Sequence, residues 1–193
     1  LARAMESCGR PGLRRLEPGF ASLVRIVVGQ QVSVAAAEGI WRRLERTVAP
    51  VTPASIAAAD AAALRSVGLS AAKTRYVQAL AQAVRGGDLN LAGLPALDDR
   101  EAVAHMVTVP GIGPWTARIY LMFALGRPDI WPAGDLAARA GLARLLSADD
   151  ARPSPQQTED WVAPYRPHRT AVALLAWHVY AVAPVGDGAG ADR

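Results

Sequence analysis

The sequence has very few of the residues that form disulfides, bind metal clusters or act as amine nucleophiles. Its 193 residues include one cysteine, Cys8, and one lysine, Lys73. A single cysteine excludes disulfides within the chain and a cysteine-ligated metal or iron–sulfur cluster. The three histidines have no metal-ligand spacing with nearby acids, so we expect no metal site built from side chains.

Long apolar runs are also missing. No stretch reaches the length of a transmembrane helix, and nothing resembles a signal peptide, so we expect a cytoplasmic protein with no membrane partner. Basic residues number 21 against 17 acidic ones, for a net charge of +4. This modest excess permits an anionic partner without establishing one.

No alternating strand pattern of useful length is present, and apolar residues recur at three- and four-residue spacing, which predicts an all-α fold. Ser33, Thr52 and Ser70 have the position and type of helix N-caps. Further helices are expected near residues 135–146, 155–163 and 167–182. We expect residues 1–183 to form the folded domain and the Gly- and Ala-rich residues 184–193 to be a flexible tail.

The string Val-Pro-Gly-Ile-Gly-Pro-Trp-Thr-Ala at residues 109–117 is typical of a phosphate-binding hairpin between two helices. Gly111 and Gly113 allow close approach to backbone N–H groups, and the next helix directs its positive end to the same place. Ile112 is expected to anchor the turn in the core, and Thr116 to extend the phosphate contact. The alternative is an ordinary tight turn.

The string Trp-Pro-Ala-Gly-Asp-Leu at residues 131–136 places one carboxylate, Asp135, at the start of a predicted helix. A fixed carboxylate stabilises the positive charge that develops on a sugar when an N-glycosidic bond breaks. The alternative is that Asp135 only caps the helix, and both roles are compatible.

Together these strings resemble the helix-hairpin-helix DNA glycosylases, most closely the 3-methyladenine DNA glycosylase II branch. The resemblance runs from Phe20 to Tyr180, and four strings carry it, at residues 28–33, 68–73, 109–117 and 131–135. A fifth, Tyr-Arg-Pro-His-Arg at residues 165–169, resembles the family string Trp-Arg-Pro-aromatic-Arg but departs from it at Tyr165, where the family has Trp, and at His168.

The resemblance implies a two-lobed fold with the active-site cleft between the lobes and a glycosylase that removes alkylated purines. It makes Asp135 the catalytic carboxylate and places Trp115 and Trp177 in the base pocket. Gln31 is implied as the wedge that fills the gap left by the flipped base, with Gln30 as its neighbour. The alternative for Gln30 is that it satisfies buried backbone groups.

Relatives that cleave the strand carry a lysine where this chain has Trp115, so a monofunctional, hydrolytic enzyme is implied. Phosphate contacts are expected from Ser70, Lys73 and Arg169, each of which is alternatively a solvated surface group. The implied partner is duplex DNA with a damaged base, bound by a monomer. No organic cofactor is implied, although a monovalent cation at the hairpin carbonyls fits the family.

Two other functions fit the same residues. The first is a glycosylase of this fold that acts on uracil, hypoxanthine or another base. The second is a non-catalytic DNA-binding module that uses the hairpin alone, although pure binding needs neither Asp135 nor the pocket tryptophans. The joint occurrence of the motifs argues against a helical scaffold with no role on DNA.

Overall fold

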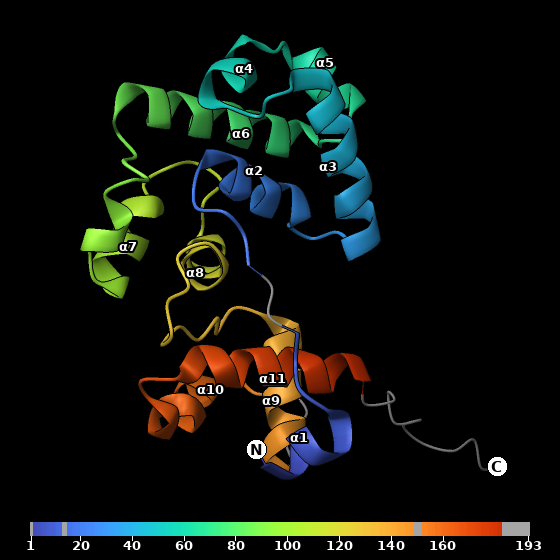
Figure 1. The fold of residues 1–193 in the computed structure, drawn as a ribbon, viewed down its shortest axis with the longest axis vertical. Coiled ribbons are helices and arrows are strands. Elements are labelled where there is room, and N and C mark those ends of the chain that lie inside the picture. The colour runs from blue at the N-terminus through green and yellow to red at the C-terminus, as the bar shows by residue number, and fades with distance from the viewer. Residues whose placement is uncertain (1, 13–14, 149–151, 183–193) are drawn as a thin grey trace, which may run out of the picture. The chain divides into compact units, whose positions relative to one another are not determined.

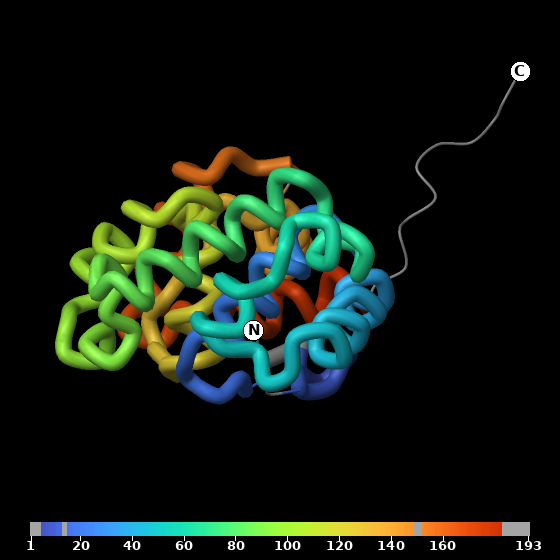
Figure 2. The backbone as a smooth tube through the Cα atoms, turned by 90° about the horizontal axis from the view of Figure 1, so that it is seen from above, coloured from blue at the N-terminus to red at the C-terminus, as the bar shows by residue number. Residues whose placement is uncertain are grey.

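The computed structural model describes residues 2–12, 15–148 and 152–182 (Figure 1). Every regular element within these ranges is helical, and the backbone tube runs through a succession of coils (Figure 2). The all-α prediction is therefore confirmed. The α-helices are α1 (Ala2–Cys8), α2 (Phe20–Gly29), α3 (Val34–Val48), α4 (Pro53–Ala58), α5 (Ala61–Ser66), α6 (Ala71–Gly86), α7 (Asp99–Met106), α8 (Pro114–Phe123), α9 (Leu136–Leu146), α10 (Pro155–Val162) and α11 (Arg169–Val182). Two 3₁₀ helices are η1 (Leu94–Ala96) and η2 (Ala163–Tyr165).

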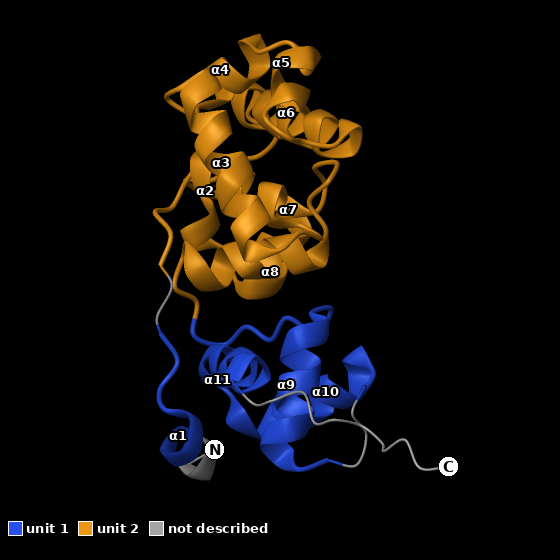
Figure 3. Cartoon of the chain, turned by 90° about the vertical axis from the view of Figure 1, so that its right-hand side faces the viewer, with its two compact units in different colours: residues 1–14, 128–193 blue, residues 15–127 orange. Residues whose placement is uncertain are grey.

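The chain divides into two compact units (Figure 3). One unit is the continuous segment 15–127, and the other combines residues 1–14 with residues 128–193. The tail expected at 184–193 lies outside the described residues, and the assignment of 1–183 to one domain stays a prediction. Among the described helices, none is long and apolar enough to cross a membrane.

Side-chain caps set most of the helix starts. The hydroxyl of Ser33 accepts from the N–H of Ala36, and that of Ser70 accepts from the N–H of Lys73, both at 3.2 Å. Thr52 forms a capping box with Ser55. The three predicted caps are thus confirmed, and each stabilises its helix by about 1 kcal/mol.

Helix α5 was not predicted from the sequence. It is a short, alanine-rich helix with one fully buried side chain, Leu64, so it has no apolar stripe to reveal it. Its one local signal is Asp60, whose carboxylate accepts from the N–H of Ala63 at 2.6 Å.

The core of the unit 15–127 forms around α2 and α6. Figure 1 shows α6 crossing this unit, with α4 on one side and α2 on the other, and α6 packs against both. Leu23 and Val27 on α2 and Leu80 on α6 are fully buried. On α8, the buried Tyr120 hydroxyl accepts from the N–H of Gly19 at 2.8 Å, and burial raises the pKa of this tyrosine.

The other unit is centred on the packing of α9 against α11. At Gly141 the α9 backbone approaches α11 so closely that a Cβ would overlap the carbonyl group of Ala176. Trp131 is buried in this unit and donates from Nε1 to the hydroxyl of Thr158 on α10 at 3.1 Å. The Nε2 atom of His178 lies 2.6 Å from the Cys8 carbonyl oxygen and so joins α11 to α1.

Replacing Gly141 with alanine is expected to lower the free energy of unfolding by about 1–3 kcal/mol, because the new methyl group meets backbone that cannot rotate away. The test is the urea midpoint followed by circular dichroism. Gly39→Ala is the matched control, because the nearest atom to its Cβ is the flexible Arg43 guanidinium at 3.5 Å. That change is expected to stabilise its helix by about 0.5–1 kcal/mol. An unchanged midpoint for Gly141→Ala would contradict the close packing.

Candidate functional site

The hairpin between α7 and α8 is a closed, anchored turn. The N–H of Ile112 donates to the carbonyl oxygen of Val109 at 3.0 Å, and the Ile112 side chain is 3 % exposed, which confirms its predicted anchoring role. Gly111 has φ +88, and a Cβ there would overlap the ring of Tyr76. Gly113 has an ordinary negative φ, and its Cβ would enter open space. Of the two hairpin glycines, only Gly111 therefore has a backbone conformation that requires glycine.

The hairpin opens onto a hollow of about 560 Å³. Helix α8 begins at this hollow with Gly113 as its N-cap, and no side chain caps it. The positive end of the helix dipole and the first-turn N–H groups favour an anion at such a position. The hollow is lined by the hairpin residues 107–113 and by Gln30, Gln31, Ser70, Ala72, Lys73 and Tyr76.

Gln30 ties the end of α2 to the hairpin. Its Nε2 donates to the carbonyl oxygen of Gly111 at 3.1 Å and to the hydroxyl of Thr116 at 2.8 Å. The structure therefore agrees with the alternative for Gln30, in which its side chain satisfies polar groups of the hairpin. The Thr116 side chain is 2 % exposed and accepts this bond, so any phosphate contact by Thr116 has to come from its backbone.

Gln31 differs from its neighbour in both exposure and backbone. It is exposed, lines the hollow and has φ +53, a left-handed conformation that is uncommon for a residue other than glycine. Because Gln31 is exposed, its side chain is not packed in the core. The placement fits the wedge predicted for Gln31, and the wedge role itself stays a prediction.

Lys73 and Ser70 lie at the start of α6, on the wall of the same hollow. The Lys73 ammonium donates to the carbonyl oxygens of Val28 at 2.7 Å and Gln30 at 2.6 Å. Burial lowers the pKa of this lysine. The alternative interpretation of Lys73 as a solvated surface group is therefore wrong. Its ammonium instead binds two backbone carbonyl oxygens, a contact that the sequence did not indicate.

In the other unit, Asp135 and Trp177 form a hydrogen-bonded pair. One oxygen of Asp135, Oδ1, accepts from the N–H of Ala138 at 2.8 Å and from Nε1 of Trp177 at 2.9 Å. Asp135 is thus the N-cap of α9, as predicted, and also the acceptor for an indole on α11. The pair therefore joins the start of α9 to α11, two helices that pack against each other.

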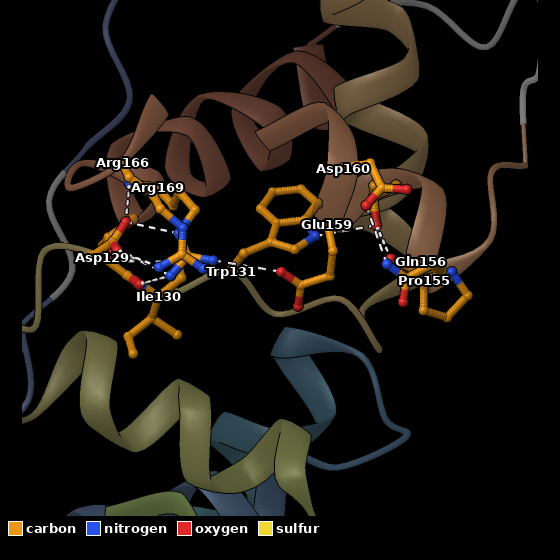
Figure 4. A network of polar contacts seen from close by, with 11 residues as sticks. Asp129, Ile130, Trp131, Pro155, Gln156, Glu159, Asp160, Arg166 and Arg169 are labelled. Carbon is orange, nitrogen blue, oxygen red and sulfur yellow. Dashed lines mark hydrogen bonds and ion pairs between the residues drawn. The ribbon is translucent and has the colours of Figure 1, made fainter. Parts of the chain in front are cut away.

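Arg169 is engaged inside its own unit (Figure 4). It donates from Nε to Asp129 Oδ1 at 2.7 Å and from Nη2 to Asp129 Oδ2 at 3.0 Å, while Nη1 lies 3.5 Å from Glu159. Arg166 adds a longer contact to Asp129 at 3.7 Å. The Arg169 guanidinium holds the pKa of Asp129 below its usual value. This largely buried bidentate pair accounts for Arg169 without DNA, and its predicted phosphate contact stays untested.

The sequence indicated candidate site residues but not the partners that they have in the structure. The Gln30 bridge, the Trp177–Asp135 bond and the Asp129–Arg169 pair each join positions far apart in the chain. Trp115 is half-buried on α8, in the unit that carries the hairpin, and its pocket role stays a prediction. Among the described residues, no group of three or more His, Cys, Asp or Glu side chains is placed to hold a metal ion.

Comparison with known proteins identifies the family. Residues 24–165 match the model of the HhH-GPD superfamily base excision DNA repair proteins. The chain belongs to the HhH-GPD superfamily. The helix-hairpin-helix prediction is therefore confirmed, together with the branch it pointed to, because several relatives are named 3-methyladenine glycosylases.

This HhH-GPD protein is 30% identical over 169 residues to DNA-3-methyladenine glycosylase 1 of Schizosaccharomyces pombe, covering 86% of this chain and 73% of the relative. It is also 30% identical over 125 residues to the putative DNA-3-methyladenine glycosylase YfjP of Bacillus subtilis, covering 65% of this chain. That alignment spans only 43% of the Bacillus subtilis protein.

Solved structures agree with the sequence relatives. The Schizosaccharomyces pombe 3-methyladenine glycosylase Mag1, in complex with abasic DNA, has a TM-score of 0.78 and 28% identity and covers 91% of this chain and 88% of its own. A DNA-3-methyladenine glycosidase of Bacillus halodurans has a TM-score of 0.79 and 28% identity, covering 93% of this chain and 83% of its own.

The two hairpin glycines of this HhH-GPD protein are expected to respond differently to alanine. Gly113→Ala should keep the thermal midpoint but weaken binding to every duplex by about tenfold, because its methyl group enters the hollow and phosphate contacts carry no sequence information. Gly111→Ala should lower the midpoint, because it adds a strained φ and a clash with Tyr76. Fluorescence anisotropy and differential scanning fluorimetry measure the two effects.

Gly12→Ala is the control for Gly113→Ala, because its Cβ also meets no atom within 4 Å and it lies in the other unit. It should leave binding unchanged. Full DNA affinity in a folded Gly113→Ala protein would show that the hairpin hollow does not contact the DNA phosphates.

Proposed function

We propose that this HhH-GPD protein is a monofunctional DNA glycosylase that hydrolyses the N-glycosidic bond of alkylated purines of the 3-methyladenine type, in base excision repair. The single observation that best supports this is the Asp135 carboxylate, held by both the α9 backbone and the indole of Trp177. The names of the relatives point to the same activity.

The chemistry follows from one oriented carboxylate. Breaking the bond between C1′ and the base nitrogen sends the bonding electrons to the base and leaves an oxocarbenium-like sugar. The negative charge of Asp135 stabilises that cation, and water then adds at C1′ and loses a proton. Glycoside hydrolases use a second acid to protonate the leaving group. A 3-methyladenine is already cationic, so one carboxylate is sufficient.

Two bonds to the same oxygen fix the Asp135 side chain before any substrate arrives. Pre-organised charge costs no reorganisation at the moment of reaction, which is the main advantage of an enzyme site over water. Trp177 takes part in this arrangement through its N–H, and its ring face is proposed to contact the damaged base. An electron-rich ring favours a cationic base by about 0.5–2 kcal/mol.

Duplex DNA is the proposed partner, bound by a monomer. The start of α8, which no side chain caps, and the Ser70 side chain at the hollow supply the kind of groups that bind a phosphodiester. The carbonyl oxygens of residues 107–113 are also the ligands that a monovalent cation would use there. We propose no organic cofactor, since the hydrolysis needs only water and a carboxylate.

One assay separates this function from its rivals. Release of free base from methylated duplex DNA is measured beside duplexes that contain uracil or hypoxanthine. Release from the methylated duplex supports the proposal, whereas release from another duplex alone would favour a glycosylase of different specificity. Tight binding without any release would favour the DNA-binding module.

Asp135→Asn is expected to abolish base release without unfolding the protein. The asparagine oxygen can still accept from Ala138 and Trp177, and asparagine caps a helix about as well as aspartate. Only the charge is lost, so release should fall by at least about 100-fold, equivalent to about 2.7 kcal/mol of transition-state stabilisation. Lesion-DNA binding should persist. Single-turnover kinetics and thermal melting measure these quantities.

Asp60→Asn is the matched control, because Asp60 makes the same type of N-cap in the other unit. It should leave base release unchanged. Near-normal release by a stable Asp135→Asn protein would falsify the catalytic assignment.

The protein is also expected to leave abasic sites uncut. Its one lysine, Lys73, donates to two carbonyl oxygens, so its amine is held away from nucleophilic attack on a sugar. Borohydride, which traps a Schiff base between protein and abasic DNA, should therefore yield no adduct. A strong adduct that disappears in Lys73→Met would show lyase chemistry at Lys73, and one that survives would assign it to the terminal amine.

A further inference from the structure

Lys73 inserts its ammonium into the end of another helix. Its Nζ lies 2.7 Å from the carbonyl oxygen of Val28 and 2.6 Å from that of Gln30. Both carbonyls lie at the C-terminal end of α2, where backbone acceptors lack helical partners and the helix dipole favours a cation. Two of the three ammonium donors are thus used within the protein.

The segment that Lys73 holds leads directly to Gln31. Both the backbone and the side chain of Gln30 are held in place. Its carbonyl oxygen accepts from Lys73, and its side-chain amide donates to Gly111 and Thr116. On the far side, Ser33 caps α3. Between these fixed points Gln31 adopts φ +53, which costs on the order of 1–3 kcal/mol for a residue other than glycine. Such a backbone persists only where its neighbours hold it.

We infer that Lys73 is a positioning residue for Gln31. Through the carbonyls of Val28 and Gln30 it holds the left-handed turn that presents Gln31 to the DNA when a base leaves the stack. The inference rests on the proposed function, because Gln31 has this task only if a base is flipped. The competing role for Lys73 is a direct phosphate contact, since the residue also lines the hollow.

A double-mutant cycle tests the link between the two residues. Lys73→Met keeps the apolar stem and removes the donors, and Gln31→Ala removes the wedge. Each single change is expected to slow base flipping about tenfold, and the double variant should be no slower than the slower single one. Flipping is followed by 2-aminopurine fluorescence next to the lesion, beside single-turnover base release. Lys73→Arg, which restores the donors, should recover most of the rate.

The salt dependence of binding separates positioning from a phosphate contact. Loss of one phosphate contact lowers the slope of log Kd against log salt by about one. Lys73→Met should keep the wild-type slope if Lys73 acts through Gln31. Arg85→Met, at the far end of α6, is the matched control for removing a positive charge from this helix. A slope lowered by one with normal flipping would overturn the inference in favour of the phosphate contact.

A measurement without DNA keeps this test independent of the proposed function. Amide hydrogen exchange at residues 29–33 should be faster in Lys73→Met than in the wild type, and unchanged in Arg85→Met. If the wild type releases no damaged base, the proposed function fails while the exchange result still decides the positioning. Native exchange rates at 29–33 in Lys73→Met, or single effects that multiply in the double variant, would overturn it. If Lys73→Met does not fold, Lys73→Gln, which keeps one donor group, takes its place in the same cycle.

Discussion

The backbone groups at helix ends are the constraint on which this structure depends. Each end leaves N–H or C=O groups without helical partners, and burying them unsatisfied costs free energy. Seven α-helices in the described part of the chain begin at a side-chain cap, from Ser33, Thr52, Asp60, Ser70, Asp98, Asp135 and Ser154. The functional groups use the same constraint, because α8 starts uncapped at a hollow and Asp135 is a cap that also carries the proposed catalytic charge.

Local signals explain why so much of the fold was predictable. A cap such as Ser33 or Ser70 bonds to an N–H three residues away, and a turn glycine such as Gly111 is needed for its own positive φ. Both features can therefore be recognised in the sequence. The hairpin and the Asp135 cap were found in this way. Helix α5 was missed because its alanine-rich sequence has no apolar stripe, although Asp60 marks its start.

The partners of the site residues were not predictable by the same means. Trp177 lies 42 positions after Asp135, and Gln30 lies 86 positions before Thr116, so no local pattern connects them. Lys73 shows the difference most clearly. Its charge suggested a phosphate contact, whereas its bonds go to the end of α2, which only the packing of α6 against α2 brings within reach. Arg169 likewise turned out to pair with Asp129.

The division of the chain also bears on how the protein is synthesised. Residues 15–127 form one continuous unit, so all of its contacts are available as soon as the ribosome has released that stretch. The unit that carries Asp135 needs residues from both sides of this stretch, including the contact of Cys8 with His178. The unit 15–127 can therefore fold during translation, whereas the unit with the carboxylate also needs α11, which emerges later. A nascent chain would form its proposed phosphate-binding surface before it forms its proposed reactive group.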